Sequence, residues 1–346
     1  MERSAHTGSA ARQRRIALAM ALLALAVLLG STLVGSVPIA PGEFVDALQS
    51  VVTGEPAGLA ASLLDLRLGR AASAFAVGAA LSLAGVMMQS LLRNPLADPY
   101  VLGISSGAAV GALGALLVGG ALWMVDLAAL GGALAISLVL YLLARRDLDG
   151  HLQRELSGDS STLLLTGVIL SAACMAVVTL MLSIAPESRL RGMVFWMVGD
   201  LSGTGWRWMP WVALCIAFGV LRARARALNV LALHAEGAAA LGVNVAGLRR
   251  MLFALAGILT AAAVTTAGAI GFVGLVVPHA CRQAFGADHR ILLPAAALGG
   301  GAFLVLADTL ARTVLAPQQL PVGVLTSLIG VPVFLFQLHQ LRMRKR

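Results

Sequence analysis

Long apolar runs separated by short polar stretches dominate this chain. A helix that crosses the hydrocarbon core of a bilayer needs about 20 apolar residues, and most of the runs approach that length. The pattern predicts an all-α, polytopic membrane protein with about ten transmembrane helices. The predicted runs cover residues 16–35, 70–92, 100–119, 122–144, 162–185, 207–221, 250–268, 270–281, 291–311 and 321–341.

Two of these runs carry special features. The run at 270–281 is too short to cross alone, so it is either a half-helix or a helix that continues past Arg282. The glycines at 268, 271 and 274, together with Pro278, argue against one continuous helix there. Backbone that is left unpaired at membrane depth must be buried or line a watery path. The first run follows four arginines, a pattern shared by signal peptides and first transmembrane helices, and its length favours a retained helix.

Composition agrees with this class. Hydrophobic residues make up 59% of the 346 residues and charged residues only 12%, too few to cover a water-facing surface. The polar interruptions are too short to bury cores of their own, so we expect one transmembrane domain over residues 1–346.

The basic residues indicate the topology. With a cytoplasmic amino terminus and alternating crossings, 19 of the 25 basic residues fall on the inner side. Both termini are therefore predicted to be cytoplasmic.

Little in the chain suggests catalysis. The only lysine is Lys345, so no Walker A motif is possible, and no metal-ligand spacing occurs. We expect no catalytic site, no metal and no cofactor. Asp308 is the main ionisable group in a predicted helix, and it lies one turn before Arg312, which favours an ion pair over a proton relay.

Two polar segments stand out. The sequence RNPLADPYVLGISSG, residues 93–107, predicts a tight cytoplasmic reversal followed by a closely packed helix with glycine at 103, 107 and 111. Residues 228–250 predict two short surface helices, the first ended by Gly242 and the second capped by Asn244. The second segment is either a stiff surface loop or a docking element for a cytoplasmic partner.

The chain resembles the permease subunits of type II ABC importers for iron–siderophore complexes, haem and vitamin B12, the FecCD-like permeases. The resemblance spans Ile16 to Leu341. It is carried by four stretches: RLGRAASAFAVGAALSLAGVMMQSLLRNPLADPYVLGISSGAAVGA, ALHAEGAAALGVN, GAIGFVGLVVPHACRQAFGADHRILLP and ADTLARTVLAPQQLPVGVLTSLIGVPVFL.

The resemblance implies a ten-helix subunit in the cell inner membrane that forms a homodimer around one translocation path. Two separate ATP-binding cassette subunits would hydrolyse ATP on the cytoplasmic side, and a substrate-binding protein would dock outside. Residues 228–250 match the family's coupling helices. The implied contacts with the ATPase are His234, Glu236, Ala239, Leu241 and Gly242.

The resemblance also implies gate residues. Asn94 and Leu96 would form part of a cytoplasmic gate, and Ser160 and Ser161 would form a second constriction. The two serines could equally cap a helix after Asp159.

On the outer side, the resemblance implies that Arg67, Arg70 and Arg312 pair with acidic residues of the binding protein. They could instead anchor helix ends or pair internally. Gly69 stands where the family usually has proline, which would loosen the entry to that helix.

Two functions are therefore considered. The first is the transmembrane subunit of an ATP-driven importer for an iron chelate, haem or cobalamin. The alternative is a stand-alone channel or an ion-coupled secondary transporter. The chain lacks a nucleotide-binding motif and a proton relay within the membrane, and both observations favour the first function. Neither observation identifies the cargo. Membrane lipid is an expected partner, and nucleic acid is not.

Overall fold

The computed structural model describes residues 2–35, 37, 39–53, 58–149, 160–202, 204, 207–233 and 235–344, and these ranges contain helices but no strand. The helices are α1 (Glu2–Leu33), α2 (Pro41–Val52), α3 (Gly58–Leu91), the 3-10 turn η1 (Pro99–Leu102), α4 (Ile104–Leu117), α5 (Leu122–Asp149), α6 (Ser160–Ile184), α7 (Glu187–Val198), α8 (Trp208–Leu233), α9 (Ala235–Ala240), α10 (Val245–Ala267), α11 (Val273–Phe285), α12 (His289–Thr313) and α13 (Val322–Arg344).

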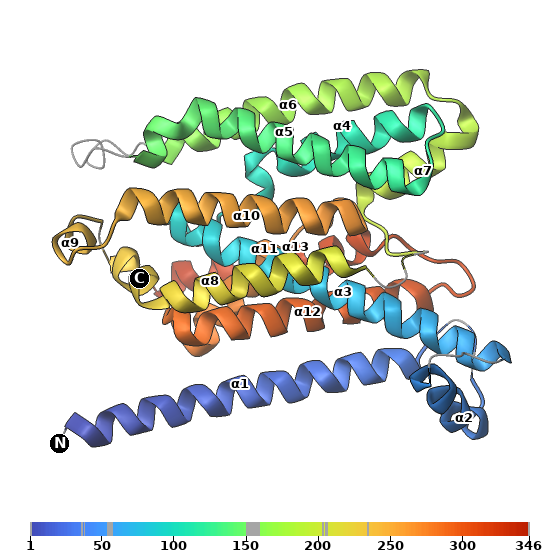
Figure 1. Cartoon of the computed structure of the whole chain (residues 1–346), viewed down its shortest axis with the longest axis horizontal. Helices are drawn as coiled ribbons and strands as arrows, with labels where there is room; N and C mark the ends of the chain where they lie inside the picture. Colours follow the sequence, from blue (N-terminus) through green and yellow to red (C-terminus); the bar gives the residue numbers. More distant parts are fainter. Residues whose placement is uncertain are drawn as a thin grey trace.

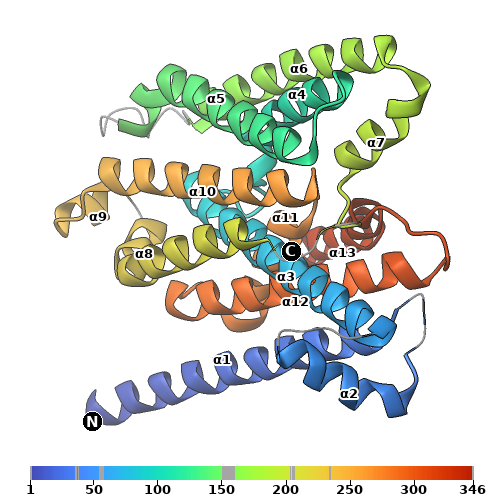
Figure 2. The same ribbon diagram turned by 45° about the vertical axis from the view of Figure 1, so that its right-hand side comes forward.

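The helices form a bundle around α3. In Figures 1 and 2, α4, α5 and α6 form one outer layer, α1 lies along the opposite side, and α8, α10, α11 and α12 surround α3. The most apolar window of α3 is 94% buried, whereas that of α1 is 17% buried. The long third helix is therefore the core of the bundle, and α1 presents most of its surface outwards.

Six helices in the described ranges are long and apolar enough to cross a membrane: α1, α3, α5, α6, α10 and α12. Two shorter apolar stretches lie in α4 and α13. Together with α8 and α11, these helices correspond to the ten predicted runs. The chain is thus an all-α, polytopic membrane protein. Figure 1 places the start of α1, the end of α13 and α9 on one side of the bundle, which agrees with two termini on the arginine-rich inner side.

Several predicted boundaries were wrong. We expected a polar outer stretch over about residues 37–66 and a helix from residue 70, but α3 already begins at Gly58, so Gly69 lies inside a helix and not at its entry. We expected arginines 222, 224 and 226 in a loop, but α8 continues through them to Leu233. The outer interruptions also contain the short helices α2 and α7. In the first two cases the helix extends beyond its apolar run, because polar residues continue a helix that neighbours already support.

Small residues bring the helix backbones together, as the glycine rows predicted. A Cβ added at Gly111 on α4 would lie 1.9 Å from the carbonyl oxygen of Ala128 on α5. One added at Gly78 on α3 would lie 2.3 Å from the carbonyl oxygen of Gly300 on α12. No side chain fits at these contacts, so the glycine rows serve close helix packing.

Candidate functional site

The inner reversal after α3 is held by its own polar side chains. The side-chain oxygen of Asn94 accepts a hydrogen bond from the backbone N–H of Leu96 at 2.9 Å, and its backbone carbonyl accepts one from Ala97 at 3.1 Å. Both Asn94 and Leu96 are exposed, Leu96 by 38% of its surface. The predicted gate residues therefore lie on a tight turn, and the apolar side chain of Leu96 is exposed there. Their role in a gate stays a prediction.

The same loop is fastened to the broken helix pair α10–α11. Asp98 accepts from the backbone N–H of Tyr100 at 2.7 Å and so caps η1. The hydroxyl of Tyr100 accepts from the backbone N–H of Ile270 at 2.9 Å. Ile270 lies in the break between the two helices, so a side chain supplies a partner that the helix cannot. The break predicted from the glycines is confirmed over residues 268–272.

A junction of backbone groups surrounds the same break. The N–H of Asp200, after α7, donates to the carbonyl of Ala267 at 2.9 Å, and the N–H of Gly323, in the first turn of α13, donates to Gly199 at 3.2 Å. A Cβ at Gly323 would lie 1.7 Å from the carbonyl oxygen of Val198. We call these joined segments, residues 198–200, 267–272 and 322–324, the backbone junction.

The second predicted constriction is only partly described. Ser160 and Ser161 are the first two residues of α6, but their side chains lie outside the described part of the chain, as does Asp159. Both roles of the two serines, in a gate and as a helix cap, stay predictions.

The predicted coupling segment contains one short helix. Residues 228–233 end α8, α9 spans six residues, and Asn244 caps α10 by accepting from the N–H of Gly247 at 2.8 Å. Gly242 ends α9 with a φ of 80°, as predicted. The second helix was predicted to be short, which was wrong, because Asn244 opens the 23-residue α10.

The predicted ATPase contacts lie on and after α9. Leu241 is 74% exposed, and Ala239 and Gly242 are exposed beside it. Glu236 belongs to α9, although its side chain is not described, and His234 lies outside the described residues. An exposed leucine at the end of a six-residue surface helix is available for a partner.

The three outer arginines are buried in the described chain. The guanidinium of Arg70 donates from Nε and Nη2 to Asp308 at 3.0 and 2.7 Å, and from Nη1 to Gln319 at 2.9 Å. Arg312 lies 3.6 Å from the same carboxylate and donates to the carbonyl of Ser31 at 2.6 Å. The ion pair expected between Asp308 and Arg312 is therefore present, and a partner from α3 joins it.

Arg67 extends this cluster to the end of α1. It donates to the carbonyl of Thr32 at 3.1 Å and to that of Val37. Arginines 67, 70 and 312 are 7%, 9% and 5% exposed, so their guanidinium groups are used inside the chain. The internal pairing that the sequence left open is observed, and docking of a binding protein at these residues stays a prediction.

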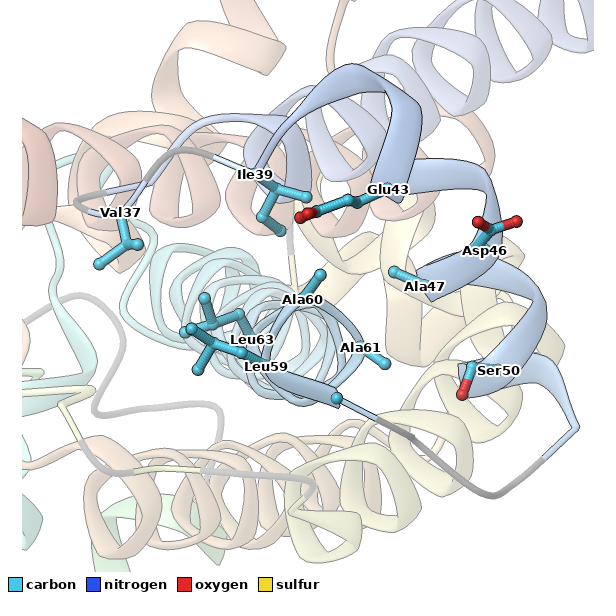
Figure 3. Close-up of a pocket in the computed structure, with 11 residues that line it drawn as sticks. Val37, Ile39, Glu43, Asp46, Ala47, Ser50, Leu59, Ala60, Ala61 and Leu63 are labelled. Carbon is cyan, nitrogen blue, oxygen red and sulfur yellow. The ribbon is translucent and has the colours of Figure 1, made fainter.

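A cavity of about 520 Å³ lies near the cluster, between α2 and the start of α3. Figure 3 shows Glu43 and Ile39 close together above Ala60 in its lining, with Asp46 and Ser50 farther along α2. Figure 1 places α2 at the opposite end of the bundle from α9. The cavity therefore belongs to the outer side.

The sequence reasoning missed one polar network. At the inner side, Ser90, Asn229, Asp288 and His289 form a hydrogen-bonded chain across α3, α8 and α12. The only local signal was the Asp-His pair that begins α12; the other two members lie far away in the sequence. No group of three or more possible metal ligands occurs in the described ranges.

Fold and site together define a multi-pass transport permease. The glycine-packed helices, the break between α10 and α11 and the exposed inner helix α9 suit a protein that moves a solute.

The chain belongs to the FecCD transport family, whose family model matches residues 22–340. The hemin transport system permease protein HmuU of Yersinia pestis is 44% identical over 284 residues, covering 79% of this chain and 81% of the relative. The vitamin B12 import system permease protein BtuC of Salmonella typhimurium is 39% identical over 332 residues, covering 94% and 95%. The cobalamin import system permease protein BtuC of Halobacterium salinarum is 43% identical over 282 residues, covering 81% and 73%.

Solved structures share the fold. A metal-chelate type ABC transporter in an inward-facing conformation aligns with a TM-score of 0.81 and 30% identity, covering 94% of this chain and 99% of that one. PsaBC from Streptococcus pneumoniae aligns with a TM-score of 0.55 at 16% identity, a likeness of fold alone. The relatives support the ATP-driven importer role expected from the sequence.

Proposed function

We propose that this chain is the transmembrane subunit of an importer that works as a homodimer in the cell inner membrane and moves an iron chelate, haem or cobalamin inwards. The observation that carries this proposal is α9, a short helix on the arginine-rich side that is followed by the exposed Leu241. Since the chain has no phosphate-binding loop, energy must come from elsewhere, and α9 offers the contact.

The partners follow from this arrangement. Two ATP-binding cassette subunits would contact His234, Glu236, Ala239, Leu241 and Gly242 of the two copies. A substrate-binding protein would dock on the outer side, and it would select the cargo. ATP hydrolysis belongs to the cassette subunits, so this chain is not itself an enzyme.

The outer arginines support docking indirectly. A binding protein that pairs with Arg67, Arg70 and Arg312 would compete with Asp308 and with backbone carbonyls that already hold them. We propose that they fix the outer ends of α1, α3 and α12 in the shape that the binding protein meets.

The gate is proposed at the inner end of the path. Asn94 and Leu96 sit on a turn that is braced by Tyr100, and Ser160 and Ser161 begin α6 on the same side. A bulky cargo needs a wide, weakly binding path with a small closing element, and an exposed leucine on a braced turn fits that need.

Reconstitution tests the proposal. The chain should be placed in liposomes with its cassette and binding-protein partners, and uptake of cobalamin, haem and several ferric siderophores measured with and without ATP. ATP-dependent uptake that also requires the binding protein is the expected result. Uptake by the chain alone would instead favour the alternative, a channel or an ion-coupled secondary transporter.

A further inference from the structure

Four polar side chains join three helices at the inner side of the bundle. Asn229 on α8 donates from its amide nitrogen to Asp288 at 2.7 Å, and its oxygen lies 2.8 Å from Nδ1 of His289. Nε2 of His289 lies 3.0 Å from the hydroxyl of Ser90, in the last turn of α3. The network therefore runs from the end of α8, through the start of α12, to the end of α3.

Asp288 determines which atoms of the network donate hydrogen bonds and which accept them. It caps α12 by accepting from the N–H of Arg290 at 2.9 Å. Partial burial alone would raise the pKa of Asp288, but the N–H of Arg290, the amide of Asn229 and nearby positive charge lower it below its ordinary value. The ionised carboxylate can only accept, so the amide nitrogen of Asn229 must face it and the amide oxygen must face His289.

His289 is completely buried, and its backbone N–H and both ring nitrogens have partners. Its backbone N–H and Nδ1 both face the oxygen of Asn229, so Nδ1 donates. In the neutral ring, Nε2 then accepts from the hydroxyl of Ser90; in the charged ring it donates to that hydroxyl, whose hydrogen can turn to the carbonyl of Val86 at 2.8 Å. Losing one partner would leave a buried ring nitrogen unpaired, which costs about 1–3 kcal/mol.

The network lies next to the element that faces the proposed ATPase. Asn229 stands four residues, about one helical turn, before the end of α8, and α9 follows directly. Leu228 and Leu231 on the same turn are 1% and 2% exposed, so this end of α8 is packed as well as hydrogen-bonded. A displacement of α9 that moves the end of α8 must therefore move His289 and Ser90 or break their bonds.

We propose that Asn229, His289 and Ser90 are positioning residues that pass movement of α9 to the inner ends of α3 and α12. The proposal rests on the proposed function, because it gives α9 an energy-supplying partner. Since α3 leads into the turn with Asn94 and Leu96, the network links the ATPase contact to the proposed gate. Weakening it should uncouple hydrolysis from transport while the ATPase remains bound.

The test compares coupling in reconstituted complexes. Ser90→Ala and Asn229→Leu each remove one link, and Ser137→Ala is the matched control, because the hydroxyl of Ser137 bonds only within α5, to Ala133 at 2.8 Å. Coupling free energies between sites commonly correspond to about fivefold or more. We expect substrate imported per ATP to fall by at least about that factor in both variants, with hydrolysis and assembly near wild type. Ser90→Thr should restore the ratio.

A second measurement keeps the proposal testable if a variant loses activity by misfolding. It follows the contact between α8 and α12 directly. Spin labels at Arg226→Cys and Ala287→Cys, in a chain whose three native cysteines are replaced, report the distance between the end of α8 and the start of α12. We expect a narrow distance distribution in the otherwise unchanged chain and a broader one with Asn229→Leu. An unchanged distribution, or an unchanged ratio of uptake to hydrolysis in folded variants, would overturn the inference. A wild-type complex without ATP-dependent uptake would overturn the proposed function instead, even where the label distances behave as expected.

Discussion

Gly85 of α3 lies against the carbonyl oxygen of Gly274 in α11, and a Cβ added at Gly85 would lie only 1.8 Å from that oxygen. Pro278, one turn further along α11, has no N–H to bond this carbonyl. The proline thus frees an oxygen in the middle of the bundle, and the glycine lets the central helix approach it.

Replacing Gly85 with alanine should force α3 and α11 apart. Overpacking a core costs about 1–3 kcal/mol, and backbone atoms cannot turn aside as a side chain can, so we expect at least that loss of stability. Thermal unfolding in detergent would measure it. Gly131→Ala on α5, where nothing lies within 4 Å of the added Cβ, should be neutral or stabilising. Equal stability of the two variants would contradict the close approach.

Replacing Asp308 with asparagine should destabilise the outer end. The change leaves the buried Arg70 and Arg312 without their shared carboxylate, and removing one partner of a buried pair costs about 3–5 kcal/mol. Asp126→Asn is the control, since Asp126 and Arg207 form a pair that is 28% and 34% exposed and worth about 1 kcal/mol or less. Chemical denaturation in mixed micelles would compare them. A similar small effect from both changes would show that the cluster is not the outer anchor.

Replacing Tyr100 with phenylalanine removes the acceptor for the N–H of Ile270. A buried backbone donor without a partner costs about 1–3 kcal/mol, so the break between α10 and α11 should open more often. Hydrogen exchange of residues 268–272 should become faster. Tyr141→Phe, at the other tyrosine of the chain, which packs against Phe253, should leave this exchange as it is.

Replacing Leu241 with serine should weaken binding of the ATPase without unfolding the chain. Full burial of a leucine is worth about 1.5–3 kcal/mol, or about tenfold or more in affinity. Val52→Ser on α2, 78% exposed at the opposite end, serves as control. Titration of the purified cassette subunit would measure both. If serine at 241 binds as tightly as leucine, α9 docks through other residues.

Replacing Leu96 with alanine should widen the proposed gate. The side chain is exposed and its turn is held by Asn94, so truncation should change closure and leave the turn intact. We expect faster leakage of a small dye from liposomes that contain the assembled transporter. Leu306→Ala, half-exposed on α12, provides a matched truncation. If dye leakage is as slow as with the wild-type protein, the turn has a structural role only.

Local rules predicted the features that depend on neighbours in sequence. The helix end at Gly242, the cap at Asn244, the break after Ala267 and the pairing of Asp308 with Arg312 all follow from residues within one or two turns. Each of these features follows from the conformational preference of one residue or from the spacing of two residues on one helix face, and both can be read from the sequence.

Partners distant in sequence could not be predicted. Arg70 and Asp308 are 238 positions apart, and Ser90 and His289 are 199 apart, so only the folded bundle brings them together. The early start of α3 at Gly58 was missed for a related reason: its first turns are polar along one side and are held by packing against α2 through Ala47, Ala61 and Leu64.

The backbone junction has a consequence for how much variation the chain can tolerate. Apart from the bond from the N–H of Ile270 to the hydroxyl of Tyr100, its bonds join main-chain groups, so most other side chains around them can be exchanged without loss of a partner. Gly199, with a φ of 88°, Gly268, with a φ of 68°, and Gly323, packed on Val198, are exceptions, because any side chain there meets strain or a carbonyl. A saturation mutagenesis map of this region should therefore show isolated intolerant glycines in a permissive background, and permeases that carry different cargoes could diverge around a common frame.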